Sequence, residues 1–78
     1  MNSNIYEITK YFKEYAEKTG NCGKLTSVKQ FNDCIRVETQ GYTDANAIAT
    51  IQKIINGKII YYKWIKNNKY LVTWYKNV

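Results

Sequence analysis

Residues 58–76 read KIIYYKWIKNNKYLVTWYK. Two runs rich in isoleucine, valine, tyrosine and tryptophan flank Asn67-Asn68, and asparagine tolerates the left-handed backbone that tight turns need. The stretch therefore predicts a β-hairpin over 58–76. It contains both tryptophans, four of the eight tyrosines and five lysines, and it has no carboxylate. Lysine interleaved with aromatic rings is typical of a binding surface.

The loop length decides which residues of this hairpin share a face. With a two-residue loop, one face carries Ile60, Tyr62, Trp64, Leu71, Thr73 and Tyr75. The opposite face carries Ile59, Tyr61, Lys63, Ile65, Tyr70, Val72 and Trp74. An unpaired ammonium is costly to bury, so the face with Lys63 at its centre is expected to lie outside the core. We predict that the Trp64–Leu71 side is buried.

A first helix is predicted over 4–19, where apolar residues recur at helical spacing. Asn4 and Glu7 have the spacing of a capping box, and Gly20 is placed to end the helix. The apolar stripe consists of Ile5, Ile8, Phe12 and either Tyr15 or Ala16.

A second helix is predicted over 44–56. Thr43 is the expected N-cap, with Asp44 in the first turn near the positive end of the helix dipole. Asn56-Gly57 is expected to stop the helix. Its apolar face consists of Ala47, Ile48, Ile51, Ile54 and Ile55.

A hairpin over 24–40 is predicted between the helices, with strands at 24–31 and 34–40 and a turn at Asn32-Asp33. The second strand alternates regularly between apolar and polar residues. The first strand does not, because Leu25 and Phe31 are out of phase with Val28. Either a bulge or a shortened strand would account for this, and the pattern does not choose between them.

The predicted fold class is therefore α+β, a single small domain over 1–78 in the order α-β-β-α-β-β. The expected packing is a four-stranded antiparallel sheet with both helices on one face, which leaves the other face open. The spacing hints at an internal repeat, since Gly20 and Gly57 lie 37 residues apart. No similarity between the residues themselves supports a duplication.

Charge is distributed unevenly along the chain. Twelve basic and six acidic side chains give a formal charge of +6. Residues 1–40 carry six basic and five acidic groups, whereas residues 41–78 carry six lysines against Asp44 alone. This asymmetry favours an anionic partner. A Lys- and Asn-rich composition inherited from an AT-rich genome is the alternative explanation.

Several function classes lack their usual residues. The chain has no histidine, which removes the commonest general base and metal ligand. Its two cysteines, Cys22 and Cys34, do not form a Cys-x-x-Cys motif, and there is no Gly-rich phosphate loop. Asp33 and Glu38 flank a tight turn and make a poor magnesium cradle. We expect no enzymatic activity, no metal site and no cofactor.

Localisation is predicted to be cytoplasmic. No apolar segment of signal-peptide type follows Met1, and no run approaches the roughly 20 apolar residues of a membrane span. Reduced thiols are then expected for both cysteines. The small size and the Lys/Asn/Ile/Tyr-rich composition are compatible with a phage or mobile-element protein.

Two functional hypotheses follow, and both use one set of residues: Tyr61, Lys63, Lys66, Lys69, Tyr70, Trp74 and Lys76. The first is a non-catalytic inhibitor or adaptor that binds a host protein or nucleoprotein through this aromatic and basic hairpin face. The alternative is non-specific binding of DNA or RNA by the same surface. A third hypothesis buries the open sheet face in a homodimer.

Overall fold

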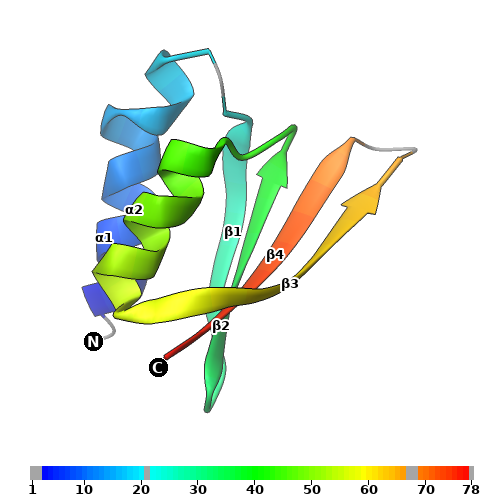
Figure 1. Cartoon of the computed structure of the whole chain (residues 1–78). Helices are drawn as coiled ribbons and strands as arrows, with labels where there is room; N and C mark the ends of the chain where they lie inside the picture. Colours follow the sequence, from blue (N-terminus) through cyan, green and yellow to red (C-terminus); the bar gives the residue numbers. More distant parts are fainter. Residues whose placement is uncertain (1–2, 21, 67–68, 78) are drawn as a thin grey trace.

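The computed structural model describes residues 3–20, 22–66 and 69–77. Its elements follow the predicted order and form an α+β fold (Figure 1). They are α1 (Ser3–Glu14), the 3-10 turn η1 (Ala16–Lys18), β1 (Lys24–Gln30), β2 (Cys34–Gln40), α2 (Ala45–Ile55), β3 (Gly57–Ile65) and β4 (Tyr70–Asn77). The predicted fold class is confirmed.

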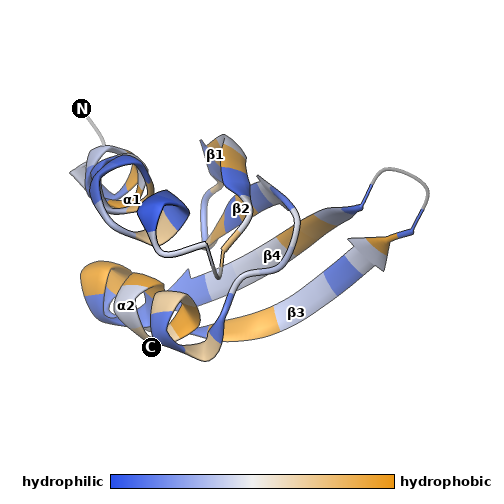
Figure 2. Cartoon of the chain, turned by 90° about the horizontal axis from the view of Figure 1, so that it is seen from above, coloured by the Kyte–Doolittle hydropathy of each residue, from blue (hydrophilic) through white to orange (hydrophobic). Residues whose placement is uncertain are grey.

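The four strands form one antiparallel sheet in the order β1-β2-β4-β3. Each hairpin pairs within itself, and β2 and β4 join the two hairpins at the centre of the sheet. Both helices cover the same face, as two perpendicular views show (Figures 1 and 2). The strands β1 and β3 are therefore the two edges.

The core lies between the helices and the central strands. Ile8 and Phe12 of α1 and Ile51 of α2 are fully buried. They pack in one cluster with side chains of β2 and β4, including Val37 and Tyr75. Burying several large side chains in this way supplies the main driving force for folding.

The first helix is shorter than the predicted range 4–19. It begins at Ser3, so Asn4 does not precede the helix as a capping residue would, and it ends at Glu14 before η1. The open choice within the apolar stripe is resolved, because Ala16 is buried and Tyr15 is 62% exposed. Gly20 has a φ of +78°, the left-handed conformation predicted there.

The irregular strand of the first hairpin contains a bulge and is also shorter than predicted. The bulge lies between Leu25, which pairs with Thr39, and Ser27, which pairs with Glu38. It brings Leu25 onto the same face as Val28, while Phe31 falls beyond the end of β1. Both explanations of the out-of-phase residues therefore apply.

The N-cap of α2 is Asp44, and the prediction of Thr43 is wrong. The Asp44 side chain accepts a hydrogen bond of 2.8 Å from the Ala47 amide. Its carboxylate then lies at the positive end of the helix dipole. The helix ends as predicted, with Asn56 in the left-handed region at a φ of 53°. Within the described residues, no helix has the length and apolarity needed to cross a membrane.

The register of the second hairpin agrees with the prediction over five residue pairs, from Ile65 opposite Tyr70 to Tyr61 opposite Trp74. The predicted turn at Asn67-Asn68 lies outside the described residues. A regular strand in this register also predicts that Ile60 pairs with Tyr75, and this pair is wrong.

A second bulge, between Ile59 and Tyr61, explains this error. It brings Ile59 opposite Tyr75 and leaves Ile60 57% exposed. On β4 the predicted faces hold, because Leu71, Thr73 and Tyr75 are buried. On β3 they hold only in part, because Trp64 is half-buried and Tyr62 is 65% exposed. The outer part of this hairpin extends past the helices (Figure 2).

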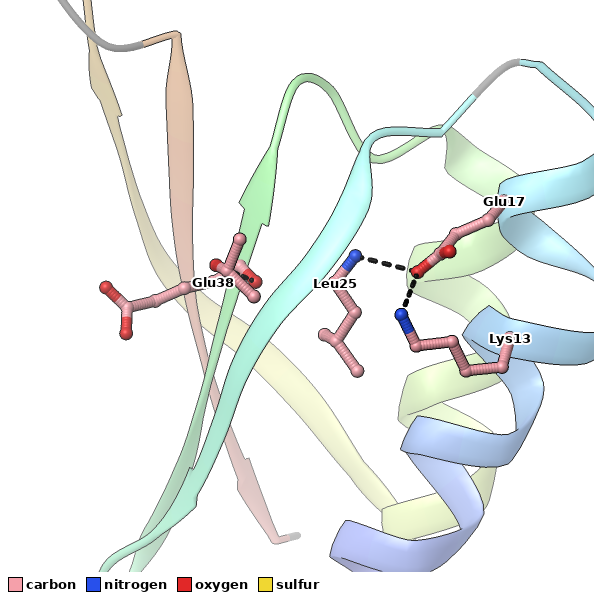
Figure 3. Close-up of polar contacts among 5 residues, drawn as sticks. Lys13, Glu17, Leu25 and Glu38 are labelled. Atoms are coloured by element: carbon pink, nitrogen blue, oxygen red, sulfur yellow. Dashed lines mark hydrogen bonds and ion pairs between the residues drawn. The ribbon is translucent and has the colours of Figure 1, made fainter.

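The two α-β-β units share one backbone plan. We call residues 3–40 the first unit and residues 44–77 the second unit. In each edge strand the residue before the bulge, Leu25 or Ile59, donates its amide to a side chain of the preceding helical segment. Glu17 accepts from Leu25 and Gln52 accepts from Ile59, both at 2.9 Å. Figure 3 shows the first of these contacts, with Lys13 bound to the same Glu17 oxygen at 3.4 Å.

The equivalence extends across the sheet. The pair Leu25–Thr39 of the first unit corresponds to the pair Ile59–Tyr75 of the second. Equivalent residues are therefore 34 positions apart in the edge strands and 36 apart in the central strands. Val37 and Thr73 are equivalent by this offset and lie directly opposite each other. In an antiparallel pair this places an approximate two-fold axis between β2 and β4. The two hairpins are therefore similar in backbone, but the glycine that corresponds to Gly57 is Gly23, 34 positions earlier, and not Gly20 as the spacing suggested.

Candidate polyanion-binding face

The sheet face turned away from the helices is called the open face below. Side chains alternate along a strand, so the open face carries the neighbours of the buried residues Ile35, Val37, Leu71 and Thr73. The side chain of Glu38 in Figure 3 points away from the helices and illustrates this orientation. The central strands contribute Cys34, Arg36, Glu38, Gln40, Tyr70, Val72, Trp74 and Lys76.

Cross-strand pairing arranges these side chains in rows. Arg36, Trp74 and Tyr61 lie side by side on three neighbouring strands, and Lys29 pairs with Arg36 from β1. Directly opposed residues have Cβ atoms about 4.5–5.5 Å apart, so these four side chains form a continuous band. Lys63 belongs to the adjacent row, where it faces Val72.

The structure brings together five of the seven residues that the sequence singled out. Tyr61, Lys63, Tyr70, Trp74 and Lys76 all lie on the open face. Tyr61 is 56% exposed, whereas Tyr70 and Trp74 are half-buried. The other two, Lys66 and Lys69, are exposed on either side of the hairpin tip, where the Lys69 amide donates to the Lys66 carbonyl at 3.3 Å.

Three residues of the first hairpin were not singled out from the sequence. The Arg36 guanidinium lies 5.4 Å from the ring centroids of both Phe31 and Trp74, within cation–π range. The two rings are 5.4 Å apart and tilted by 37°. The Lys29 ammonium lies 5.9 Å from the Phe31 ring. The sequence did mark Phe31 by its break in the alternation and Arg36 by its place on the polar face of β2. It did not indicate that either residue lies beside Trp74, because that depends on the pairing of β2 with β4.

Arg36 is held mainly by these rings. Its ion pair to Glu38 at 3.7 Å has both side chains nearly one-third exposed, and such surface pairs contribute at most about 1 kcal/mol. Within the described part of the chain, the buried Arg36 Nε has no hydrogen-bond partner. A buried donor of this kind is commonly satisfied by water or by a ligand.

All of the net charge lies on the sheet. The helical segments and their caps carry four cations and four carboxylates, namely Lys10, Lys13, Lys18, Lys53, Glu7, Glu14, Glu17 and Asp44. The strands and hairpin loops carry eight cations and two carboxylates, namely Lys24, Lys29, Arg36, Lys58, Lys63, Lys66, Lys69, Lys76, Asp33 and Glu38. Only Glu38 of the two carboxylates lies within a strand. The sheet therefore accounts for the formal +6, while the helical layer is neutral.

The described residues contain no group of three His, Cys, Asp or Glu side chains that could hold a metal ion. Cys22 and Cys34 are both free thiols. The Cys22 sulfur accepts a weak hydrogen bond from the Asp44 amide at 3.5 Å. Burial raises the pKa of this thiol, which lowers the fraction of reactive thiolate.

No family model matches the chain, and no curated protein or solved structure is significantly similar to it. The site must therefore be interpreted from its own chemistry. A basic sheet face with aromatic rings between the cations suits a ligand that is both anionic and flat. Charge attracts such a ligand over a distance, and the rings add short-range contact area.

Proposed function

We propose that the protein is a non-catalytic binding module that holds a nucleic-acid strand against its open face. The observation that carries this proposal is the location of the whole +6 charge on the sheet, together with the band of Arg36, Trp74 and Tyr61. Nucleic acid combines phosphates with flat bases and so matches both features. Helices and sheet have separate roles in this proposal: the helices build the core and the sheet binds.

The roles of individual residues follow from their positions. Lys29, Lys63 and Lys76 are exposed cations on three different strands and would contact phosphates. Tyr61 and Trp74 would stack on bases, which contributes about 1–3 kcal/mol per base in proteins of this kind. Both rings have a neighbouring cation within the open face to hold the adjacent phosphate.

Binding of this kind would depend little on base sequence. Bidentate recognition of guanine usually needs arginine, and the chain has one arginine, Arg36. Its guanidinium is already engaged by Phe31 and Trp74. Backbone charge and stacking then supply most of the affinity, and neither selects a base strongly.

A second candidate function is the blocking of a host protein or nucleoprotein, including one of phage or mobile-element origin acting on its host. It is favoured by the exposed Tyr61 beside Trp74 and Arg36, since tyrosine, tryptophan and arginine are the commonest hot-spot residues of protein interfaces. The positive charge of the sheet would attract an acidic protein surface as well as a nucleic acid. This candidate shares the open face with the first, so one experiment distinguishes them.

The experiment compares two triple variants that lose equal charge from opposite layers. Lys29→Gln/Lys63→Gln/Lys76→Gln removes charge from the open face, and Lys10→Gln/Lys18→Gln/Lys53→Gln removes it from the helical layer. The ligand is a fluorescein-labelled oligothymidylate of about 16 nucleotides, measured by anisotropy at 0.1 M salt. Each phosphate contact contributes about a factor of five under these conditions, so the sheet variant should bind about 100-fold more weakly.

The helical variant should bind within about twofold of the wild type, because its lysines lie far from the proposed ligand. Equal losses in the two variants would contradict an open-face site. If the wild type binds no oligonucleotide but retains a host protein after nuclease treatment of the lysate, the second candidate replaces the first.

A further inference from the structure

The edge strand β3 differs from its structural equivalent β1 in a way that the fold does not require. The bulge residue and its two successors are Thr26, Ser27 and Val28 in β1 and Ile60, Tyr61 and Tyr62 in β3. The three residues of β3 are 57%, 56% and 65% exposed. Natural proteins usually protect a sheet edge with polar or charged residues, as β1 does. The same backbone position in β3 instead presents large apolar side chains to solvent.

An apolar groove lies beside this edge, on the helix side of the sheet. It has a volume of about 220 Å³, and its lining includes Tyr42, Ile48, Ile59, Tyr62, Trp64 and Leu71. Ordinary small-molecule pockets measure about 300–1,000 Å³, so this groove is better matched to a side chain than to a cofactor.

One wall of the groove is a stacked pair of aromatic rings. The rings of Tyr42 and Trp64 stack at 4.5 Å with an angle of 6° between their planes. Two backbone hydrogen bonds hold the loop that carries Tyr42. The Tyr42 carbonyl accepts a hydrogen bond of 2.6 Å from the Gly23 amide, and the Gly41 amide donates one of 2.7 Å to the Lys69 carbonyl. A wall built in this way is already in place before a partner arrives, which lowers the entropic cost of binding.

The backbone of β3 is accessible next to the groove. Before the bulge, the Ile59 amide already donates a hydrogen bond to the Gln52 side chain. Beyond the bulge β3 is an edge of the sheet, and among the described residues no further strand pairs with its outer side. An exposed edge of this kind can accept an extended peptide as an added strand, with alternate side chains filling adjacent pockets.

Charge indicates which peptide fits. β3 contains Lys58 and Lys63, Lys66 follows it, and neither β3 nor β4 contains a carboxylate. A second copy of this chain would bring the same lysines face to face, and like charges across paired strands are destabilising. An extended segment that alternates apolar and acidic residues would satisfy both the groove and the lysines.

We propose that the outer edge of β3 and the adjacent groove bind an extended acidic peptide segment of a partner protein by strand addition. One apolar side chain of the peptide enters the groove between Tyr62 and the Tyr42–Trp64 pair. Acidic side chains on the opposite side of the added strand approach Lys63. This surface adjoins the polyanion site and shares Lys63 with it, and Tyr61 lies between the two.

The test uses the full chain and a synthetic eight-residue peptide that alternates leucine and glutamate. Binding is followed by amide chemical shifts in NMR. The largest shifts should fall on residues 60–65, and the dissociation constant should weaken at least tenfold in Tyr62→Ser. Tyr6→Ser is the matched control, because Tyr6 is a similarly exposed tyrosine on α1 and its replacement should leave the affinity unchanged.

Two altered peptides test strand addition and charge separately. A peptide with alternate backbone amides methylated should lose binding at least tenfold, and a leucine–lysine peptide should bind at least tenfold more weakly. Undiminished binding of either one would overturn the proposal. It is also overturned if the leucine–glutamate peptide does not bind, or if the chain dimerises at micromolar concentration and Tyr62→Ser abolishes the dimer.

Discussion

The two α-β-β units have the same backbone plan and opposite surface chemistry. Both place a bulge after a residue whose amide is bound by a helical side chain. Both also have a glycine packed against the central strand, Gly23 just before β1 and Gly57 at the start of β3. Two equivalent positions on the open face show the difference. Ser27 of the first unit corresponds to Tyr61 of the second, and Glu38 corresponds to Trp74. Residues 1–40 carry six basic and five acidic groups, whereas residues 41–78 carry six and one.

The comparison separates fold from function. Positions with the same role in both units, such as Gly23 and Gly57, are explained by backbone geometry. Positions that differ while the backbone is the same, such as Ser27 and Tyr61, are not required by the fold. These differing positions place aromatic rings on the second unit and leave it with fewer carboxylates for the same number of cations, and we therefore attribute binding to them.

The largest expected effect concerns the shared glycines. A Cβ atom at Gly57 would collide with the Lys76 carbonyl, and one at Gly23 would collide with the Gln40 carbonyl. Gly57→Ala and Gly23→Ala should each lower the free energy of unfolding by about 3 kcal/mol or more, because the obstacle is backbone and cannot rotate away. Chemical denaturation measures both. A large loss in one variant and none in the other would break the equivalence of the units.

The next effect concerns Trp74 and its equivalent Glu38. Trp74→Ala should weaken oligonucleotide binding about 10- to 100-fold, the equivalent of roughly 1–3 kcal/mol of stacking, while Trp74→Phe should keep most of the affinity. Glu38→Ala should strengthen binding a few-fold, because it removes the carboxylate beside Arg36. Thermal unfolding of each variant separates loss of binding from loss of folding. Tighter binding by Trp74→Ala would contradict the proposed role of this ring.

A third prediction concerns pH and the buried Tyr75. Its hydroxyl has no hydrogen-bond partner in the described part of the chain, and burial raises its pKa well above the usual value near 10. Above pH 10 the unfolded chain releases this proton and the folded chain keeps it, so stability is lost as the pH rises. The loss is about 1.4 kcal/mol per pH unit, and it should be absent in Tyr75→Phe.

At neutral pH, Tyr75→Phe should leave the free energy of unfolding unchanged or raise it by about 1 kcal/mol, since it removes an unsatisfied buried group. Urea denaturation at pH 7 and at pH 11 measures both effects. A variant that is less stable than the wild type at pH 7 would indicate that the hydroxyl has a partner.

The smallest effect concerns the amide contacts before the two bulges. Gln52→Ala should cost about 1 kcal/mol of stability, because the half-buried Ile59 amide loses its acceptor. Glu17→Ala should cost slightly more, since a charged acceptor forms the stronger bond to the Leu25 amide. Both values come from urea denaturation. A neutral effect at both positions would show that these contacts do not hold the edges.

Much of the fold was predictable because its signals are local. Helical spacing and turn residues gave the element order, and the cost of burying Lys63 gave the correct face of β4. The bulge in β3 was not predictable, since Ile59 and Ile60 are both apolar and fit either phase. The exposure of Tyr62 depends on its packing against the rest of the fold, which no pattern within β3 encodes.

The candidate site was predictable only on the second hairpin. Tyr61, Lys63 and Trp74 follow from alternation within one hairpin. The contribution of Phe31 and Arg36 depends on pairing between β2 and β4, whose paired residues are 30 or more positions apart in the chain. Long-range pairing of this kind is not indicated by periodicity, so the cluster around Arg36 appears only in the folded structure.

The most direct test of the account is the salt dependence of oligothymidylate binding. For the three phosphates contacted by Lys29, Lys63 and Lys76, the logarithm of the association constant should fall with a slope of about −2 against the logarithm of salt concentration. Lys63→Gln should reduce the magnitude of that slope by about 0.7, and Lys53→Gln on the helical layer should not change it. A slope near zero, or an equal change in both variants, would contradict a polyanion site on the open face.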